Sequence, residues 1–250
     1  MENGYVKIRR HGKNVLAWEE QAETIAKALI QGEGCEAVEE AGRGTVYRFE
    51  LPGGCGMVRR YKRGGLVRFF LSDAYILSNR PLREFRLHLQ IQKEGLPVPK
   101  LLGACWERRG LFVRGAIATE GLPAQNLCEF LSHSPEGPDE ELRRCGTVIR
   151  RMHDMHVWHA DLQVKNILVG AGGPWLIDFD NAVIRPHLSP LLRARNLLRL
   201  RRSIQKNGLS PAYFKPLCDG YGVEALPEWL SRIYDVKGRV SDLTGISRNP

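Results

Sequence analysis

The chain has 250 residues, of which 43% are apolar and 26% are charged, and its formal net charge at pH 7 is +9. These values are typical of a soluble globular protein that is long enough to bury a proper core. No apolar run approaches the roughly 18 residues that span a bilayer, and the first ten residues lack the apolar centre of a secretory signal. We therefore expect a cytoplasmic chain without a transmembrane segment.

The net charge indicates the kind of partner, and the cysteine pattern indicates the state of the thiols. A net charge of +9 predicts a polyanionic partner, which by charge alone could be a nucleotide, a nucleic acid, or a phosphorylated or anionic lipid surface. The six cysteines are scattered, with no Cys-x-x-Cys pair and no histidine at zinc spacing. We expect reduced thiols that are mostly buried.

The first sixty residues predict a helix followed by strands. Apolar residues recur at helical spacing from Trp18 to Leu29, which indicates a surface helix. Two strands then flank a turn that holds Gly42 and Gly44, where bare backbone could approach phosphate oxygens. Tyr47 occupies the place of a third glycine, so any phosphate-covering turn here is irregular. The next predicted strand is Met57–Tyr61.

A basic segment and a helix follow. Lys62–Phe70 is either a solvated loop or an anion-binding flap. Pro81 opens a helix that Gly95 ends, since proline is favoured in a first turn. Leu111–Ala118 is a predicted strand, and Thr119–Pro123 is a predicted hinge between two parts of the chain.

The part after the hinge is mostly helical by its pattern. Glu140–His156 carries a buried helical stripe, and His153 and His156 on it are expected to pack rather than to bind a ligand. A second helix, Pro190–Gln205, has an apolar face that is surrounded by basic residues. Such a helix is either an ordinary solvated face or a surface for anionic membrane or substrate. The alternative is that the helix packs within its own part of the chain, with its arginines binding phosphate or structural carboxylates. Its basic residues are Arg193, Arg195, Arg199, Arg202 and the adjoining Lys206.

One stretch carries the candidate chemistry. His159, Asp161 and Asn166 lie in a loop that opens into an apolar run, and Asp178 follows a buried-looking strand shortly afterwards. Phosphoryl transfer from a nucleotide needs a carboxylate to accept the proton of the attacking hydroxyl. It also needs an amide and a second carboxylate to hold magnesium against the phosphates. Asp161 is the candidate for the first role, and Asn166 and Asp178 are the candidates for the second.

This spacing resembles the catalytic and metal-binding loops of the protein-kinase-like fold. Ala160 stands where protein kinases carry Arg, which favours the branch that phosphorylates small molecules and sugars. In the kinase plan Arg59 would bind the nucleotide phosphates in place of lysine, and Glu84 would orient Arg59. The competing interpretations are an exposed strand Arg and a Glu placed favourably near a helix N-terminus.

A closer resemblance is to the 3-deoxy-D-manno-octulosonic acid (Kdo) kinases of lipopolysaccharide synthesis. It runs from about residue 40 to 206, and the Arg-x-Tyr-x-Arg-Gly-Gly and Asp-Phe-Asp segments are its more specific marks. The segments that carry it are Val58–Leu66, Arg83–Leu87, Gly95–Pro99, His159–Leu162, Asn166–Leu168, Leu176–Asp180 and Asn196–Ser203.

The resemblance implies a two-lobed α+β kinase with an N-lobe of residues 1–120 and a C-lobe of residues 121–250. It implies ATP and Mg²⁺ as cofactors, with Gly42, Gly44 and Arg59 near the phosphates. The implied acceptor is a Kdo sugar on a lipid A precursor at the inner face of the cytoplasmic membrane, with no nucleic-acid partner. Other acceptors, namely a core heptose, a small molecule or a protein hydroxyl, stay open, as does an inactive module that binds anionic lipid.

Overall fold

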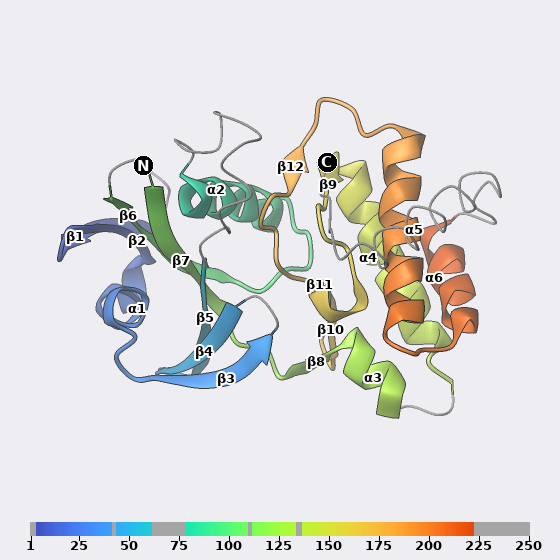
Figure 1. Cartoon of the computed structure of the whole chain (residues 1–250), viewed down its shortest axis with the longest axis horizontal. Coiled ribbons are helices and arrows are strands. Elements are labelled where there is room, and N and C mark those ends of the chain that lie inside the picture. Colours follow the sequence, from blue (N-terminus) through green and yellow to red (C-terminus); the bar gives the residue numbers. More distant parts are fainter. Residues whose placement is uncertain (1–3, 42–43, 62–78, 110–111, 134–136, 223–250) are drawn as a thin grey trace. The chain divides into compact units, whose positions relative to one another are not determined.

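The computed structural model describes residues 4–41, 44–61, 79–109, 112–133 and 137–222. The chain divides into two compact units, Met1–Leu122 and Pro123–Pro250. The first unit is built around a β-sheet and the second is mostly helical, which agrees with the expected α+β class (Figure 1). The assignment of nucleotide binding to the first unit and acceptor binding to the second stays a prediction.

The first unit contains a seven-stranded antiparallel sheet with the strand order β1-β2-β6-β7-β5-β4-β3. The hairpin β3–β4 contains the expected pair of strands, with Gly44 opening β4 opposite Ala41, whereas Gly42 lies outside the described residues. The strands are β1 (Tyr5–Arg10), β2 (Lys13–Trp18), β3 (Cys35–Ala41), β4 (Gly44–Leu51), β5 (Gly54–Arg60), β6 (Leu101–Arg109) and β7 (Phe112–Glu120).

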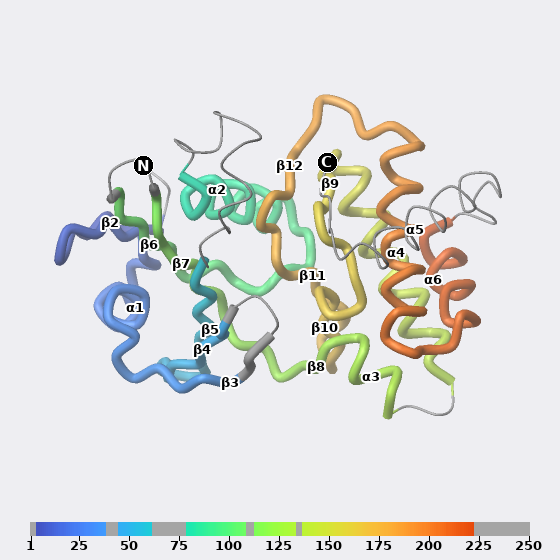
Figure 2. Tube along the Cα trace, in the orientation of Figure 1, coloured from blue at the N-terminus to red at the C-terminus, as the bar shows by residue number. Residues whose placement is uncertain are grey.

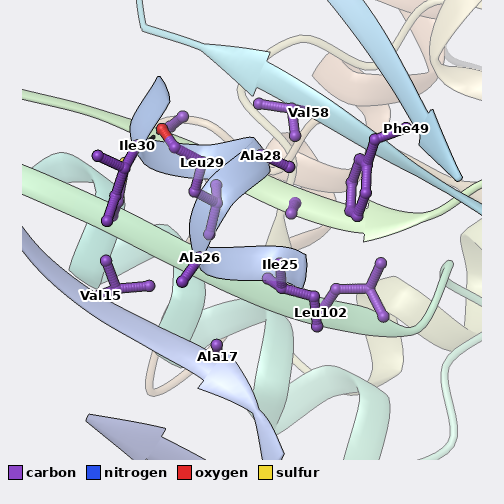
Figure 3. Packing of buried hydrophobic residues seen from close by; sticks show 13 residues of the cluster. Val15, Ala17, Ile25, Ala26, Ala28, Leu29, Ile30, Phe49, Val58 and Leu102 are labelled. Atoms are coloured by element: carbon purple, nitrogen blue, oxygen red, sulfur yellow. Dashed lines mark hydrogen bonds between the residues drawn. The ribbon is translucent and has the colours of Figure 1, made fainter. Parts of the chain in front are cut away.

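Two helices cover opposite faces of this sheet. Helix α1 (Ala22–Gln31) packs Ile25 and Leu29 against one face, on which Val58 of β5 lies (Figure 3). Helix α2 (Arg80–Lys93) packs Phe85 against the other face. Because successive residues of a strand point to opposite faces, the residue that follows Val58 is on the face that α2 covers. That residue is Arg59.

Several boundaries differ from the sequence prediction. The helix expected from Trp18 begins only at Ala22, because Trp18 ends β2 and pairs with Tyr5 of β1. The helix α2 begins at Arg80, so Glu84 lies in its second turn and not in the first. A favourable interaction with the helix N-terminus therefore does not account for the position of Glu84. The basic segment from Lys62 to Phe70 lies outside the described residues.

The second unit combines helices with short strands. Strands β8, β10 and β11 form one small antiparallel sheet, and β9 pairs with β12. The strands are β8 (Ala124–Asn126), β9 (Val157–Trp158), β10 (Ile167–Gly170), β11 (Gly173–Leu176) and β12 (Val183–Ile184). The α-helices are α3 (Leu127–His133), α4 (Asp139–Asp154), α5 (Pro190–Lys206) and α6 (Phe214–Tyr221), with one-turn helices at Val164–Asn166 and Pro211–Tyr213.

Helices α4 and α6 pack closely, and Figure 2 shows the two tubes side by side. A Cβ atom added to Gly146 of α4 would lie 2.1 Å from the Leu217 carbonyl oxygen, so only glycine permits this approach. The buried face of α4 includes Leu142, Ile149 and His153. The expected helix therefore exists, although it ends before His156.

The cysteines and the helices bear on two further expectations. All six cysteines are free, and Cys105, Cys145 and Cys218 are buried whereas the others are half-buried. Half of the thiols are buried, so the expectation that most of them are buried is met only in part. In the ranges that the structure describes, none of the helices is both long enough and apolar enough to span a bilayer.

Candidate active site

The β10–β11 hairpin brings Asn166 and Asp178 to the same end of a small sheet. Ile167 pairs with Leu176 in this antiparallel ladder, so the residues just before β10 and just after β11 are neighbours. The Ile177 amide donates to the Asn166 carbonyl at 3.1 Å, which extends the pairing by one step. Asn166 and Asp178, separated in sequence, therefore lie together because of strand pairing.

Asp161 is tied to the same place through Asn166. The Nδ2 atom of Asn166 donates to the Asp161 backbone carbonyl at 2.8 Å. The Asp161 carboxylate is 53% exposed, and it accepts from Gln163 Nε2 at 2.9 Å and from Arg199 Nη1 at 3.1 Å. We name residues 159–166 the Asp161 loop. The structure thus brings together the three residues that the sequence singled out in this unit.

His159 fixes the start of the Asp161 loop from the inside. Its Nδ1 accepts from the Asp161 amide at 3.1 Å, so its other nitrogen, Nε2, carries the proton and donates to the Ile177 carbonyl at 3.1 Å. Burial lowers the pKa of His159, which keeps the ring neutral and suits this tautomer. A neutral, fully buried ring supports the loop and presents no reactive atom to solvent.

One face of α5 supplies the remaining supports. The side chain of Asn196 accepts from the His159 amide at 3.3 Å and donates to the His159 carbonyl at 2.8 Å. Ser203 Oγ accepts from the Val164 amide at 3.1 Å. Sequence reasoning assigned no role to these two residues. The available signal was a polar residue on a buried helical stripe, since a buried amide or hydroxyl needs a partner.

Two arginines of the basic helix α5 do not form a simple solvated or membrane-facing surface, because each pairs with a carboxylate of the same unit. Arg199 pairs with Asp161, and Arg193 Nη1 contacts Asp154 Oδ1 at 2.6 Å. Both guanidinium side chains are only about a quarter exposed, at 25% and 23%. These two arginines therefore stabilise the unit from within, as the alternative interpretation of the helix allowed.

The side chains at the hairpin end fit a magnesium ion by their chemistry. Mg²⁺ takes oxygen ligands and uses few protein groups beside phosphate oxygens and water. The Nδ2 atom of Asn166 donates to the Asp161 carbonyl, so its Oδ1 is the atom that could bind a metal, and Asp178 adds a carboxylate. Asp178 also has a φ of +63°, a conformation that costs energy in a non-glycine residue and is concentrated at functional sites.

The first unit holds the expected ion pair between Arg59 and Glu84. Arg59 Nη2 donates to both Glu84 carboxylate oxygens, at 2.6 Å and 2.8 Å. The Tyr61 hydroxyl donates to Glu84 Oε2 as well, a contact that the sequence did not indicate. Glu84 is 6% exposed, and a buried carboxylate needs such partners. Glu84 therefore orients Arg59 on the α2 face of the sheet.

Comparison with solved structures defines the fold. The fold resembles that of WaaP in complex with acyl carrier protein, with a TM-score of 0.53, 16% identity, and coverage of 80% of this chain and 87% of the other. It also resembles spectinomycin phosphotransferase in complex with ADP and spectinomycin, with a TM-score of 0.56, 10% identity, and coverage of 84% and 80%. The fold is the kinase-like fold that the sequence predicted.

Sequence comparison defines the family. The profile of the lipopolysaccharide kinase (Kdo/WaaP) family matches residues 29–221, and the chain belongs to this family. The 3-deoxy-D-manno-octulosonic acid kinase of Xanthomonas campestris pv. campestris (strain B100) is 38% identical over 181 residues, covering 70% of this chain and 72% of that protein. The enzyme of the same name from Xylella fastidiosa (strain M12) is 38% identical over 183 residues, with the same coverage. The family match and these two relatives confirm the expected resemblance to the Kdo kinases, and with it a phosphotransferase.

The buried His153 generates a pH prediction. His153 joins α4 to α5 and α6 through Asn196 Oδ1 at 3.1 Å and the Tyr221 hydroxyl at 2.9 Å. Burial lowers its pKa from 6.5 to about 4. Between these pH values the unfolded chain binds a proton at His153 that the folded chain does not. The contribution of His153 to the free energy of unfolding is therefore fully present above pH 6.5 and is lost as the pH drops toward 4. The loss is at most about 3 kcal/mol.

Urea unfolding of the wild type and of His153→Gln at several pH values checks this prediction. The variant is less stable near neutral pH, because Asn196 loses one of its hydrogen-bond partners, but its stability declines less steeply below pH 6.5. His88, which also has a pKa lowered to about 4 by burial, contributes equally to both proteins. Identical pH slopes in the two proteins would show that His153 does not titrate in this way.

Proposed function

We propose that this protein transfers the γ-phosphoryl group of ATP to a hydroxyl of a Kdo sugar on a lipid A precursor. Two findings support the acceptor: membership of the Kdo/WaaP family and relatives named 3-deoxy-D-manno-octulosonic acid kinase at 38% identity. The observation that carries the chemistry is the arrangement of Asp161, Asn166 and Asp178 around the end of the β10–β11 hairpin. The reaction belongs to the synthesis of the lipopolysaccharide core.

In this proposal Asp161 orients the acceptor hydroxyl and accepts its proton. The hydroxyl oxygen forms a bond to the γ-phosphorus, the bond from that phosphorus to the bridging oxygen breaks, and ADP leaves with the electron pair. The hydrogen bonds from Gln163 and Arg199 hold the Asp161 carboxylate in place. His159 and Asn196 keep the loop backbone in position.

Asn166 and Asp178 would hold Mg²⁺, which when bound neutralises charge on the nucleotide phosphates. In the first unit, Arg59 would bind phosphate oxygens and Glu84 would keep its guanidinium group oriented. An arginine presents a planar fork to a phosphate, which suits this role although protein kinases use lysine. The roles of Gly42 and Gly44 near the phosphates stay a prediction of the sequence.

The acceptor is lipid-anchored, so we further propose that the enzyme meets it at the inner face of the cytoplasmic membrane. Arg195 is half-buried and Lys206 is exposed, and neither makes an ion pair within the part of the chain that the structure describes. These α5 side chains are the better candidates for contact with an anionic surface. Arg193 and Arg199 are already paired with carboxylates.

The first prediction from the proposed function concerns Asp161. Asp161→Asn keeps the shape of the side chain but removes the proton acceptor, so turnover should fall by about 10²–10⁴-fold while nucleotide affinity stays close to that of the wild type. Phosphate transfer from labelled ATP to a Kdo–lipid A precursor measures turnover, and calorimetry measures ADP binding. Asp219→Asn, on the exposed α6 pair with Lys215, is the matched control. Near-normal turnover in Asp161→Asn would remove this residue from the mechanism.

The second prediction concerns Asp178. Asp178→Ala should abolish the increase in ADP affinity that Mg²⁺ produces, because a magnesium ligand is lost, and should leave metal-free ADP binding largely unchanged. Calorimetric titrations with Mg²⁺ and with EDTA measure both quantities. An unchanged magnesium effect on ADP affinity would contradict the assignment of Asp178.

The third prediction concerns the membrane. The double variant Arg195→Gln, Lys206→Gln should bind anionic vesicles about 30-fold more weakly at low salt, since each basic residue at such a surface contributes about 1 kcal/mol. The difference should shrink as salt rises. Vesicle sedimentation across a salt series measures it, with Lys215→Gln on α6 as the control. Equal binding by the wild type and the double variant would exclude a membrane contact through these side chains.

A further inference from the structure

Arg199, one of the two side chains that hold the Asp161 carboxylate, lies directly beside Asp161. Arg199 Nη1 is 3.1 Å from Asp161 Oδ1, and this carboxylate is the only hydrogen-bond partner of Arg199 among the described residues. A general base needs to be oriented, and the bond from Gln163 at 2.9 Å already does this for the other oxygen. The full positive charge of Arg199 at this position therefore indicates a second role beside the orientation of Asp161.

The acceptor provides that reason through its charge. An octulosonic acid carries a carboxylate at neutral pH, and this carboxylate must come close to Asp161 when a hydroxyl of the same sugar is placed against Asp161. Two carboxylates at short range repel each other unless a cation lies between them. A neutral sugar would meet no such repulsion.

We propose that Arg199 binds the carboxylate of the acceptor sugar and thereby selects acidic sugars over neutral ones. This inference rests on the proposed function and adds the residue that determines its acceptor class. Arg199 shares its positive charge between Asp161 and the incoming acid, so one guanidinium group both holds the base and recognises the substrate.

The geometry of the pair suits this role. A guanidinium group has several N–H donors in a planar fork that matches a carboxylate, and Asp161 takes only one of them. The Arg199 side chain is 25% exposed and the Asp161 side chain is 53% exposed, so the pair is open to a solute. An incoming carboxylate can thus reach the guanidinium group while the bond to Asp161 persists.

The backbone that carries Arg199 is also fixed. Asn196 and Ser203, three residues before and four residues after it on α5, are both buried and both hydrogen-bonded to the Asp161 loop. Residues at these separations lie on one side of a helix. The helix therefore places Arg199 at a set position relative to Asp161, as a side chain that selects substrates requires.

The experiment compares two water-soluble acceptors: a Kdo glycoside and the same glycoside with its carboxylate converted to the amide. The wild type should prefer the acid in kcat/KM by about 10–100-fold, the usual worth of a charge-assisted hydrogen bond. Arg199→Gln should bring this preference close to one, mainly by raising KM for the acid, and Arg199→Lys should keep part of it. Arg144→Gln, which breaks a similar pair with Glu141 at 3.0 Å on α4, should keep the wild-type preference.

The outcomes separate a substrate-binding role from a purely positioning one. If Arg199 only positions Asp161, Arg199→Gln lowers kcat for both acceptors by the same factor and the preference for the acid survives, which would overturn the inference. If the wild type phosphorylates neither glycoside nor the lipid-linked acceptor, the proposed function itself falls, and the inference falls with it.

Discussion

The second unit depends on the buried side chain of Asn196. Its oxygen accepts from the His159 amide and contacts His153, and its nitrogen donates to the His159 carbonyl. A buried amide that loses such partners costs about 1–3 kcal/mol, so the α4, α5 and Asp161 loop backbones are held in one arrangement. Through His159, this arrangement extends to Asp161 on one side and to the strand end before Asp178 on the other.

In each unit, residues far apart in the sequence meet because of the regular geometry of strands. The antiparallel register of β10 and β11 places Asn166 beside the chain that leads to Asp178. In the first unit, the alternation of β5 turns Val58 toward α1 and Arg59 toward Glu84 on α2. The candidate functional side chains therefore sit on hydrogen-bonded elements with buried neighbours, as positioning for phosphoryl transfer requires.

The sequence predicted what short patterns determine. The Asp161 loop, the strand before Asp178 and the helices α4 and α5 each have a local signature. The contact between Arg59 and Glu84 was expected from the resemblance to the kinase plan. It did not predict the β1–β2 hairpin or the late start of α1, because tertiary pairing of Trp18 overrides its helical spacing. Nor did it predict the contact of Arg199 with Asp161, since a basic helix has the same pattern whether its charges face solvent or a carboxylate.

The most direct test of this account is mass spectrometry of the lipid product after incubation with ATP and Mg²⁺. Two acceptors are compared, a Kdo-bearing lipid A precursor and the same precursor without the Kdo sugar. The account predicts that one phosphoryl group is gained by the first acceptor, that fragmentation places it on the Kdo residue, and that the second acceptor is unchanged. Phosphorylation of the precursor without Kdo, or consumption of ATP with no phosphate on the Kdo residue, would contradict it.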